Sequence, residues 1–104
     1  MPPITIHLSG AFRAEQHGKP LDALSRRAQG LLAYLVCQPG MRAERGALAD
    51  LLWSDRSEEQ ARASLRQELS VLRKLLAEAL EADRRTVWLK PGAVHAEYGT
   101  GEFL

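Results

Sequence analysis

The segment from residue 57 to residue 80 constrains the fold more than any other part of the sequence. Ser57 and Gln60 have the spacing of a capping box, in which each side chain accepts a hydrogen bond from the other residue's backbone N–H. Beyond Gln60 an apolar residue recurs at every third or fourth position: Ala61, Leu65, Leu69, Leu72, Leu76 and Leu80. Because this is the repeat of one helix face, we predict a long helix over about 58–80 with its leucines buried.

A shorter helix is predicted upstream, with Ser25 as its N-cap and Pro39-Gly40 as its end. Its apolar residues have the spacing of one buried stripe: Ala28, Leu31, Leu32, Leu35 and Val36. Gly30 inside this helix lowers helix propensity by about 1 kcal/mol relative to Ala, so we expect a neighbouring element to pack closely there. A further helix is predicted from about Glu44 to Leu52, burying Leu48, Leu51 and Leu52.

Short strands are expected on both sides of the helices. Residues 4–8 alternate apolar and polar side chains, and residues 11–15 resemble a second strand. After turn residues, Leu21 begins either a brief third strand or a lead into the next helix. These segments predict a small N-terminal antiparallel sheet. Residues 86–90 and 93–96 flank the turn pair Pro91-Gly92, which predicts a C-terminal β-hairpin.

The composition fits one small globular domain spanning residues 1–104. The chain carries a formal net charge of +1 and 45% hydrophobic residues, enough for one core. Its longest apolar run, from Leu31 to Cys37, is too short to span a membrane, and no signal segment precedes it. We therefore expect a soluble, cytoplasmic protein with no membrane partner.

The single cysteine and the two tryptophans are expected to be structural. Cys37 cannot form an internal disulfide, which agrees with a reducing compartment, and it closes an apolar stripe, so we predict a small buried residue. Trp53 and Trp88 each stand beside a leucine and are expected to pack rather than to stack on bases.

No arrangement of residues predicts catalysis. His7, His17 and His95 fall on different elements without cysteines or carboxylates at the spacing of metal ligands, and Gly18-Lys19 lacks the rest of a phosphate-binding loop. We therefore expect no enzyme activity, no metal and no cofactor.

The order of the predicted elements is that of an α+β winged helix-turn-helix with an N-terminal antiparallel sheet, a three-helix core and a C-terminal hairpin wing. In that fold the third helix enters the DNA major groove, so its face opposite the leucines must carry hydrogen-bond donors. That face and its flank hold Arg62, Ala63, Arg66, Gln67, Ser70, Arg73 and Lys74. Arg and Lys can pair with guanine, Gln with adenine, and Ala63 can contact a thymine methyl group. The alternative is that these residues only solvate a surface helix.

Three further basic residues bracket the predicted hairpin: Arg84, Arg85 and Lys90. A wing over about 86–96 would bring them near DNA phosphates or the minor groove. Alternatively, Arg84 and Arg85 stabilise the C-terminus of the preceding helix, where cations are favoured.

Several of these segments resemble a known family. Residues 25–35, the Leu51-Leu52-Trp53 motif, and residues 61–73 with their Ala-Arg-x-x-Leu-Arg pattern are similar to the DNA-binding domain of the Streptomyces antibiotic regulatory protein (SARP) family, of the OmpR/PhoB-type winged-helix class. The resemblance covers nearly the whole chain. It implies a bacterial transcription regulator that binds double-stranded DNA through the third helix and the wing.

The resemblance also implies partners. The loop from Trp53 to Ser57 corresponds to one that can contact RNA polymerase in this class, and family members bind direct repeats as side-by-side protomers. A helical activation domain normally follows, so Tyr98–Leu104 resembles a connection and the chain is expected to be the N-terminal module of a longer protein. Because the net charge is only +1, the alternative is a winged-helix protein-interaction module that no longer reads DNA.

Overall fold

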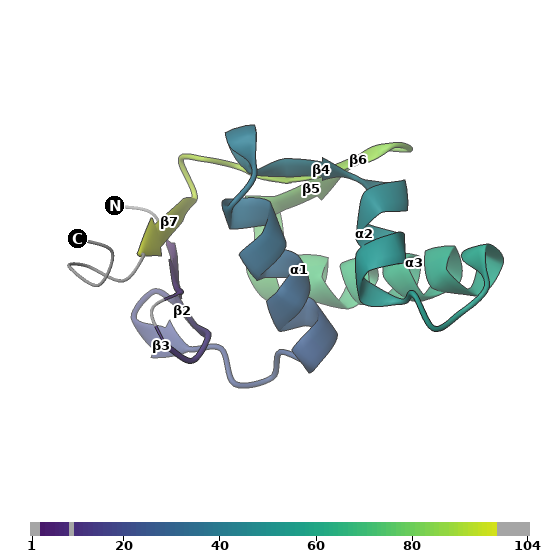
Figure 1. Cartoon of the computed structure of the whole chain (residues 1–104). Helices are drawn as coiled ribbons and strands as arrows, with labels where there is room; N and C mark the ends of the chain where they lie inside the picture. The colour runs from purple at the N-terminus through teal and green to yellow at the C-terminus, as the bar shows by residue number, and fades with distance from the viewer. Residues whose placement is uncertain (1–2, 9, 98–104) are drawn as a thin grey trace, which may run out of the picture.

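The computed structural model describes residues 3–8 and 10–97, which form a small α+β domain (Figure 1). The described part contains three α-helices: α1 (Arg26–Val36), α2 (Arg45–Leu52) and α3 (Glu58–Leu76). It contains seven short strands: β1 (Ile4–His7), β2 (Arg13–Gln16), β3 (Lys19–Pro20), β4 (Arg42–Glu44), β5 (Leu80–Ala82), β6 (Thr86–Leu89) and β7 (Val94–Glu97). Short 3-10 turns lie at η1 (Pro39–Met41) and η2 (Ala77–Ala79). Within the described ranges, no helix is both long and apolar enough to cross a bilayer.

The helix caps predicted from the sequence are confirmed. The Ser25 hydroxyl accepts a hydrogen bond from the backbone N–H of Ala28 at 3.0 Å, and so caps α1. Ser57 and Gln60 form both hydrogen bonds of the capping box at the start of α3. Both helices bury the apolar stripes that the sequence predicts, because those side chains all lie on one face.

The predicted extent of α3 is wrong at its C-terminal end. The helix stops at Leu76, and Ala77 has a φ of 52°, a left-handed conformation that turns the chain away from the helix axis. Leu80 is fully buried as expected, but it begins β5 rather than the last turn of a helix. An apolar residue at helical spacing is also compatible with a strand, so periodicity alone missed the boundary.

Close packing between α1 and α2 explains the glycine within α1. A Cβ atom placed on Gly30 would lie 3.2 Å from Cδ2 of Leu52, which is tighter than ordinary contact. The predicted burial within α2 is only partly correct, since Leu48 is buried but Leu51 is 53% exposed and Leu52 is half-buried. Ala49 takes the second buried position because α2 turns that face toward the core. The prediction for Cys37 is also wrong, because this C-cap residue of α1 is exposed.

One sheet contains the N-terminal strands in the order β3-β2-β1-β7. The antiparallel pairing of β1, β2 and β3 agrees with the sequence prediction, although β2 begins two residues later and β3 precedes Leu21. Strand β7 was not expected here. It pairs with β1 in parallel, with Ile4 opposite Val94 and Ile6 opposite Ala96.

The predicted hairpin over 86–96 is therefore wrong. Strand β6 pairs antiparallel with β5 on one side and β4 on the other, giving a second sheet in the order β4-β6-β5. The turn at Pro91-Gly92 exists, closed by a hydrogen bond from the N–H of Ala93 to the carbonyl of Lys90. It redirects the chain to β1 rather than back along β6, because turn residues mark a change of direction and not the next partner.

A single hydrophobic core joins both sheets to the helices, with Ile6, Leu35, Leu65 and Val87 among its buried members. Trp53 is 3% exposed and packs in this core, as predicted. Trp88 lies on the opposite side of β6 from the buried Val87 and Leu89 and is half-buried, with the Arg42 guanidinium 5.9 Å from its ring centre. Trp88 lies on the outer side of β6 because neighbouring residues of a strand point to opposite faces of the sheet.

Candidate nucleic-acid interface

The outer face of α3 is uncovered. All seven residues predicted on the face opposite the leucine stripe or on its flank are exposed: Arg62, Ala63, Arg66, Gln67, Ser70, Arg73 and Lys74. Within residues 3–8 and 10–97, neither sheet nor hairpin covers them, since the buried residues of α3 are Ala61, Leu65, Leu69, Leu72 and Leu76. The helix therefore presents a polar, mainly basic surface to solvent.

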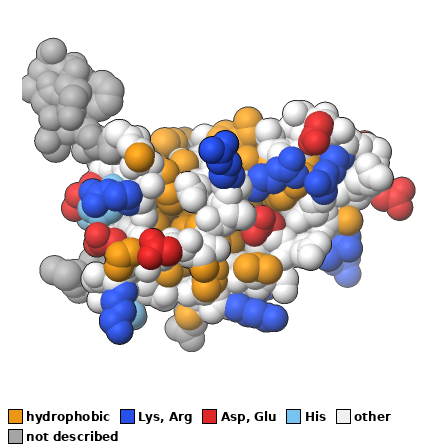
Figure 2. Space-filling model, turned by 90° about the horizontal axis from the view of Figure 1, so that it is seen from below, with side chains coloured by type: hydrophobic (Ala, Val, Ile, Leu, Met, Phe, Trp, Pro, Cys, Tyr) orange, Lys and Arg blue, Asp and Glu red, His pale blue; other side chains and the backbone are white. Residues whose placement is uncertain are grey.

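A basic groove runs along one side of this face. It is lined by Arg45, Arg66, Leu69, Ser70, Arg73, Lys74, Ala77, Glu81 and Ala82. Four of these residues are cationic and one is acidic, so the groove has a surplus of positive charge. Figure 2 shows basic side chains on both halves of the molecule, with a row of them over the half that carries the helices. The structure thus brings Arg45, at the start of α2, into the same groove as the basic residues of α3.

A second groove lies on the other side of α3, between it and the start of α1. Gln67 faces this groove together with Ser25, Arg26, Arg27, Trp53, Arg56, Ser64, Glu68 and Val71. Several of its charges are already engaged. The Arg27 guanidinium lies 5.3 Å from the Trp53 ring centre and 3.7 Å from the Asp55 carboxylate, and the Ser25 hydroxyl donates to Glu68 at 3.0 Å.

Arg62 lines neither of these two grooves. Its guanidinium forms an exposed ion pair with Glu58, one turn earlier, at 3.2 Å. Such a surface pair contributes only about 0.3–0.5 kcal/mol to a helix, so it is easily exchanged for another anion. The predicted α3 residues therefore do not share one groove. Arg66, Ser70, Arg73 and Lys74 line the first groove and Gln67 lines the second, while Arg62 lies in a separate hollow with Glu58.

The hairpin between β5 and β6 places Arg84 and Arg85 at its exposed tip. Asp83 shapes this tip: its Oδ1 accepts hydrogen bonds from the backbone N–H groups of Arg85 at 2.9 Å and Thr86 at 2.7 Å. These two bonds, in that order, lower the pKa of Asp83 below its ordinary value. Desolvation opposes them, and the positive charges of Arg42 and Arg45 lower the pKa further by smaller amounts. The tip is thus held by a carboxylate that is ionised at neutral pH.

Arg45 connects the hairpin tip to α2. Its backbone N–H donates to the carbonyl of Arg85 at 2.7 Å, and its Nε donates to the carbonyl of Asp83 at 2.7 Å. Lys90, in contrast, stands at the base of the hairpin, where its N–H donates to the carbonyl of Ala79 at 2.9 Å. The structure therefore groups Arg84 and Arg85 with Arg45 and separates Lys90 from them.

Sequence reasoning missed Arg42 and Arg45. Arg45 lines the α3 groove, while Arg42 shares a shallow hollow with Ala43, Glu44, Arg85 and Thr86. A basic residue at the start of a helix gave a weak signal, but only the pairing of β4 with β6 shows that it meets the hairpin. The expected connecting segment Tyr98–Leu104 lies outside the described residues.

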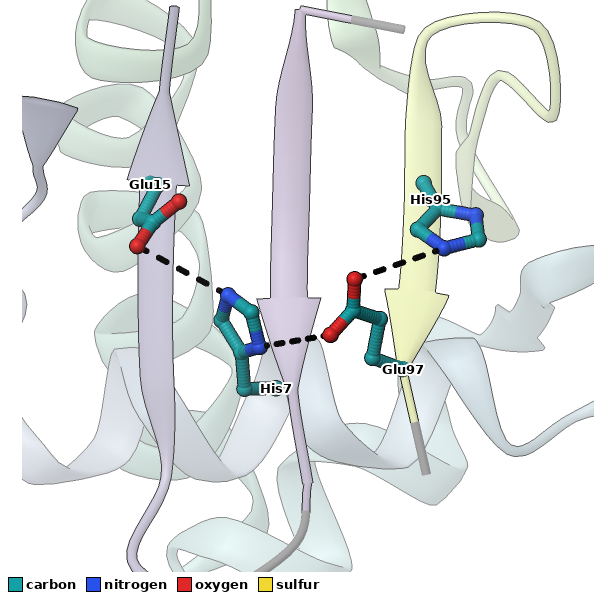
Figure 3. A network of polar contacts seen from close by, with 4 residues as sticks. All are labelled: His7, Glu15, His95 and Glu97. Carbon is teal, nitrogen blue, oxygen red and sulfur yellow. Dashed lines mark ion pairs between the residues drawn. The ribbon is translucent and has the colours of Figure 1, made fainter. Parts of the chain in front are cut away.

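A second polar cluster lies on the N-terminal sheet (Figure 3). His7 on β1 stands between Glu97 on β7, with Nδ1 3.1 Å from the carboxylate, and Glu15 on β2, with Nε2 3.7 Å away. At 3.7 Å the Glu15 carboxylate does not accept a hydrogen bond from Nε2, which is buried without a hydrogen-bond partner in the described chain. His95 approaches Glu97 at 3.8 Å. These residues tie β7 to β1, and no group of side chains in residues 3–8 and 10–97 has the arrangement of a metal site.

Comparisons with protein-family models, with curated proteins and with solved structures find no match to this chain.

Proposed function

We propose that this domain is a sequence-specific double-stranded DNA-binding module of a bacterial transcription regulator, with the arrangement of a winged helix-turn-helix. The observation that carries the proposal is the uncovered face of α3, whose exposed Arg66, Ser70, Arg73 and Lys74 lie along one basic groove. A major groove about 12 Å wide admits one α-helix, and Arg and Gln side chains are suited to hydrogen bonding with base edges. The proposal assigns no catalytic residue, metal or cofactor.

Base reading is assigned to the N-terminal half of α3, through Arg62, Ala63, Arg66 and Gln67. The C-terminal half, with Ser70, Arg73 and Lys74, contacts phosphates, which supply most of the affinity. The groove beside β5 supports this division, because Ser70, Arg73 and Lys74 all line it together with Arg45. Of the four base-reading residues, Arg66 alone lines it as well, near the middle of the helix.

The β5–β6 hairpin takes the role of the wing. Its tip carries the exposed Arg84 and Arg85, which contact phosphates or the adjacent minor groove. Lys90 stands at the base of the hairpin and is not part of this contact.

The SARP resemblance suggests further partners for the same module. The loop between α2 and α3 exposes residues 54–57 while Trp53 is buried, so those four residues are the ones available to RNA polymerase. Side-by-side binding of protomers on direct repeats, and a place at the N-terminus of a longer regulator, also belong to the proposal.

Two matched substitutions on α3 test the assignment after a binding site has been selected from a random pool of duplexes. Arg66→Ala is expected to cost about 1–3 kcal/mol of binding free energy and to relax preference at one base position. Lys74→Ala is expected to weaken binding to all sequences alike and to lower the slope of log affinity against log salt by about one. Unchanged affinity of the Arg66→Ala protein for the selected site would contradict the base-reading role.

The second candidate is a protein-interaction module on the same scaffold. It is favoured by the net charge of only +1 and by the carboxylates that already neutralise Arg62 and Arg27. Titration of a mixed-sequence duplex at two salt concentrations separates the candidates. Binding that falls steeply with salt supports the DNA-binding module, and no binding at low salt supports the interaction module.

A further inference from the structure

Two hydrogen bonds from Arg45 join α2 to the tip of the β5–β6 hairpin, and together they form the Arg45 clip. The backbone N–H and the Nε of Arg45, each 2.7 Å from its acceptor, bind the carbonyls of Arg85 and Asp83. Both acceptors belong to the tip of the hairpin, while Arg45 itself begins α2 and lines the groove of α3. One residue therefore fixes the hairpin tip relative to the helices.

Most N–H donors of the Arg45 guanidinium are available to a ligand. Of its five N–H groups, the described part of the chain uses the one on Nε. The groove it lines also contains Arg66, Arg73 and Lys74, with Glu81 as the opposing charge. A phosphodiester suits this set, because guanidinium groups bind phosphate oxygens in a fixed, forked geometry.

Asp83 organises the carbonyl that Arg45 binds. Its carboxylate accepts from the N–H groups of Arg85 and Thr86, and its own N–H donates to the carbonyl of Thr86 at 2.9 Å. These bonds close the hairpin turn. Without them the Asp83 and Arg85 carbonyls lose the geometry that holds Arg45.

We infer that Arg45 and the α3 groove form a binding site for a DNA backbone phosphate, and that Asp83 is a positioning residue that locks this site and the hairpin tip into one unit. The inference rests on the proposed function and deepens it. In this role Asp83, although negatively charged, supports binding to a polyanion.

Because Asp83 is negatively charged, the substitutions Asp83→Ala and Asp83→Asn test its positioning role. Removing a negative charge by itself strengthens attraction to DNA, whereas losing the clip weakens binding. We expect Asp83→Ala to bind duplex about three- to tenfold more weakly than the parent, consistent with the loss of hydrogen bonds that order the site. Asp83→Asn keeps a side-chain oxygen that can accept both N–H groups, so it should bind at least as tightly as the parent.

Glu44→Gln is the matched control, because Glu44 is an exposed carboxylate opposite Thr86 in the β4–β6 pair and caps no helix with its side chain. It should equal or exceed the parent in affinity. Arg45→Ala should lower the slope of log affinity against log salt by about 0.9, as expected for one phosphate contact. Asp83→Ala binding as tightly as Glu44→Gln, or an unchanged salt slope for Arg45→Ala, would overturn the inference.

Amide hydrogen exchange separates this result from failure of the proposed function. Exchange at Arg85 and Thr86 should be faster in Asp83→Ala than in the parent and little changed in Asp83→Asn. A parent protein that binds no duplex contradicts DNA binding, and with it the phosphate site, whatever the exchange rates. If Asp83→Ala does not fold, Arg45→Lys replaces it: the charge remains but the Nε donor is lost, so faster exchange at Arg85 is expected, and unchanged exchange contradicts the clip.

Discussion

At the residue scale, Gly30 has a low helix propensity, but its lack of a side chain leaves room for Leu52 of the neighbouring helix. Replacing glycine by alanine inside a helix gains about 1 kcal/mol of stability from propensity alone. The new methyl group would meet Leu52 at 3.2 Å, and overpacking of this kind costs about 1–3 kcal/mol. The two effects oppose each other at a single contact.

We therefore expect Gly30→Ala to leave the free energy of unfolding within about 1 kcal/mol of the parent, because propensity and overpacking offset each other. In a Leu52→Ala background the contact is absent, so the same substitution should stabilise by about 1 kcal/mol. Urea unfolding of the four proteins of this cycle measures both values. Equal effects in the two backgrounds would show that the glycine is not there for packing.

The charge state of Asp83 is linked to the stability of the fold. Its pKa is lowered in the folded protein, chiefly by the hydrogen bond from Arg85 and then by that from Thr86. The ionised form is thus favoured by folding. Its contribution to stability is complete above the unfolded-state pKa, near 3.8, and is lost as the pH falls through the lower, folded value.

Acid unfolding tests this sign. Between neutral pH and pH values below 3.8, the parent should lose more stability than Asp83→Asn, because the variant has no carboxylate to protonate at that position. The urea midpoint, followed by circular dichroism at each pH, measures the difference. Parallel pH profiles for the two proteins would contradict the role given to the carboxylate.

At the scale of elements, the caps that predicted the helices should be measurable in stability. Ser57→Ala removes the side-chain acceptor for the Gln60 N–H and should destabilise the protein by about 1 kcal/mol. Ser54→Ala is the control, since Ser54 is exposed in the preceding loop, and its effect should stay within about 0.5 kcal/mol. Equal thermal midpoints for the two variants would mean that the capping box contributes nothing.

The helices could be predicted because their signals are local. Caps and apolar spacing lie within a few residues of each other, so α1 and α3 begin where Ser25 and Ser57 indicate. Strand partners are chosen across the chain instead. Nothing near Pro91-Gly92 encodes that β6 pairs with β5 and β4 while β7 joins β1, and the hairpin was assigned to the wrong pair of strands for that reason.

Part of the candidate interface could likewise be predicted from local sequence, and part could not. The exposed residues of α3 follow directly from helical geometry, because the side opposite a buried stripe faces solvent. The share of Arg45 in the groove depends on the β4–β6 pairing and on the turn at Asp83, which are contacts between distant segments. The spacing of apolar residues therefore predicts the exposed face of α3, but it does not predict that Arg45 connects this region to the hairpin.

At the scale of the whole molecule, the two sheets belong to one folding unit. Ile4 and Ile6 of one sheet and Val87 and Leu89 of the other belong to the same buried cluster. A small domain with one core is expected to unfold in a single cooperative step. Tryptophan fluorescence and far-ultraviolet circular dichroism should therefore give the same urea midpoint, and separate midpoints would indicate that the N-terminal sheet unfolds independently.

The parallel pairing of β1 with β7 also affects how the domain forms during synthesis. Ile4 leaves the ribosome long before its partner Val94, so one edge of β1 remains without its hydrogen-bond partner until nearly all of the described chain has emerged. Contacts between such distant residues slow folding, because a long loop must close, at a cost in chain entropy, before the contacts stabilise the structure. The helices can assemble early, whereas the N-terminal sheet is completed last, and a nascent chain halted before β7 would carry an unprotected strand edge open to self-association.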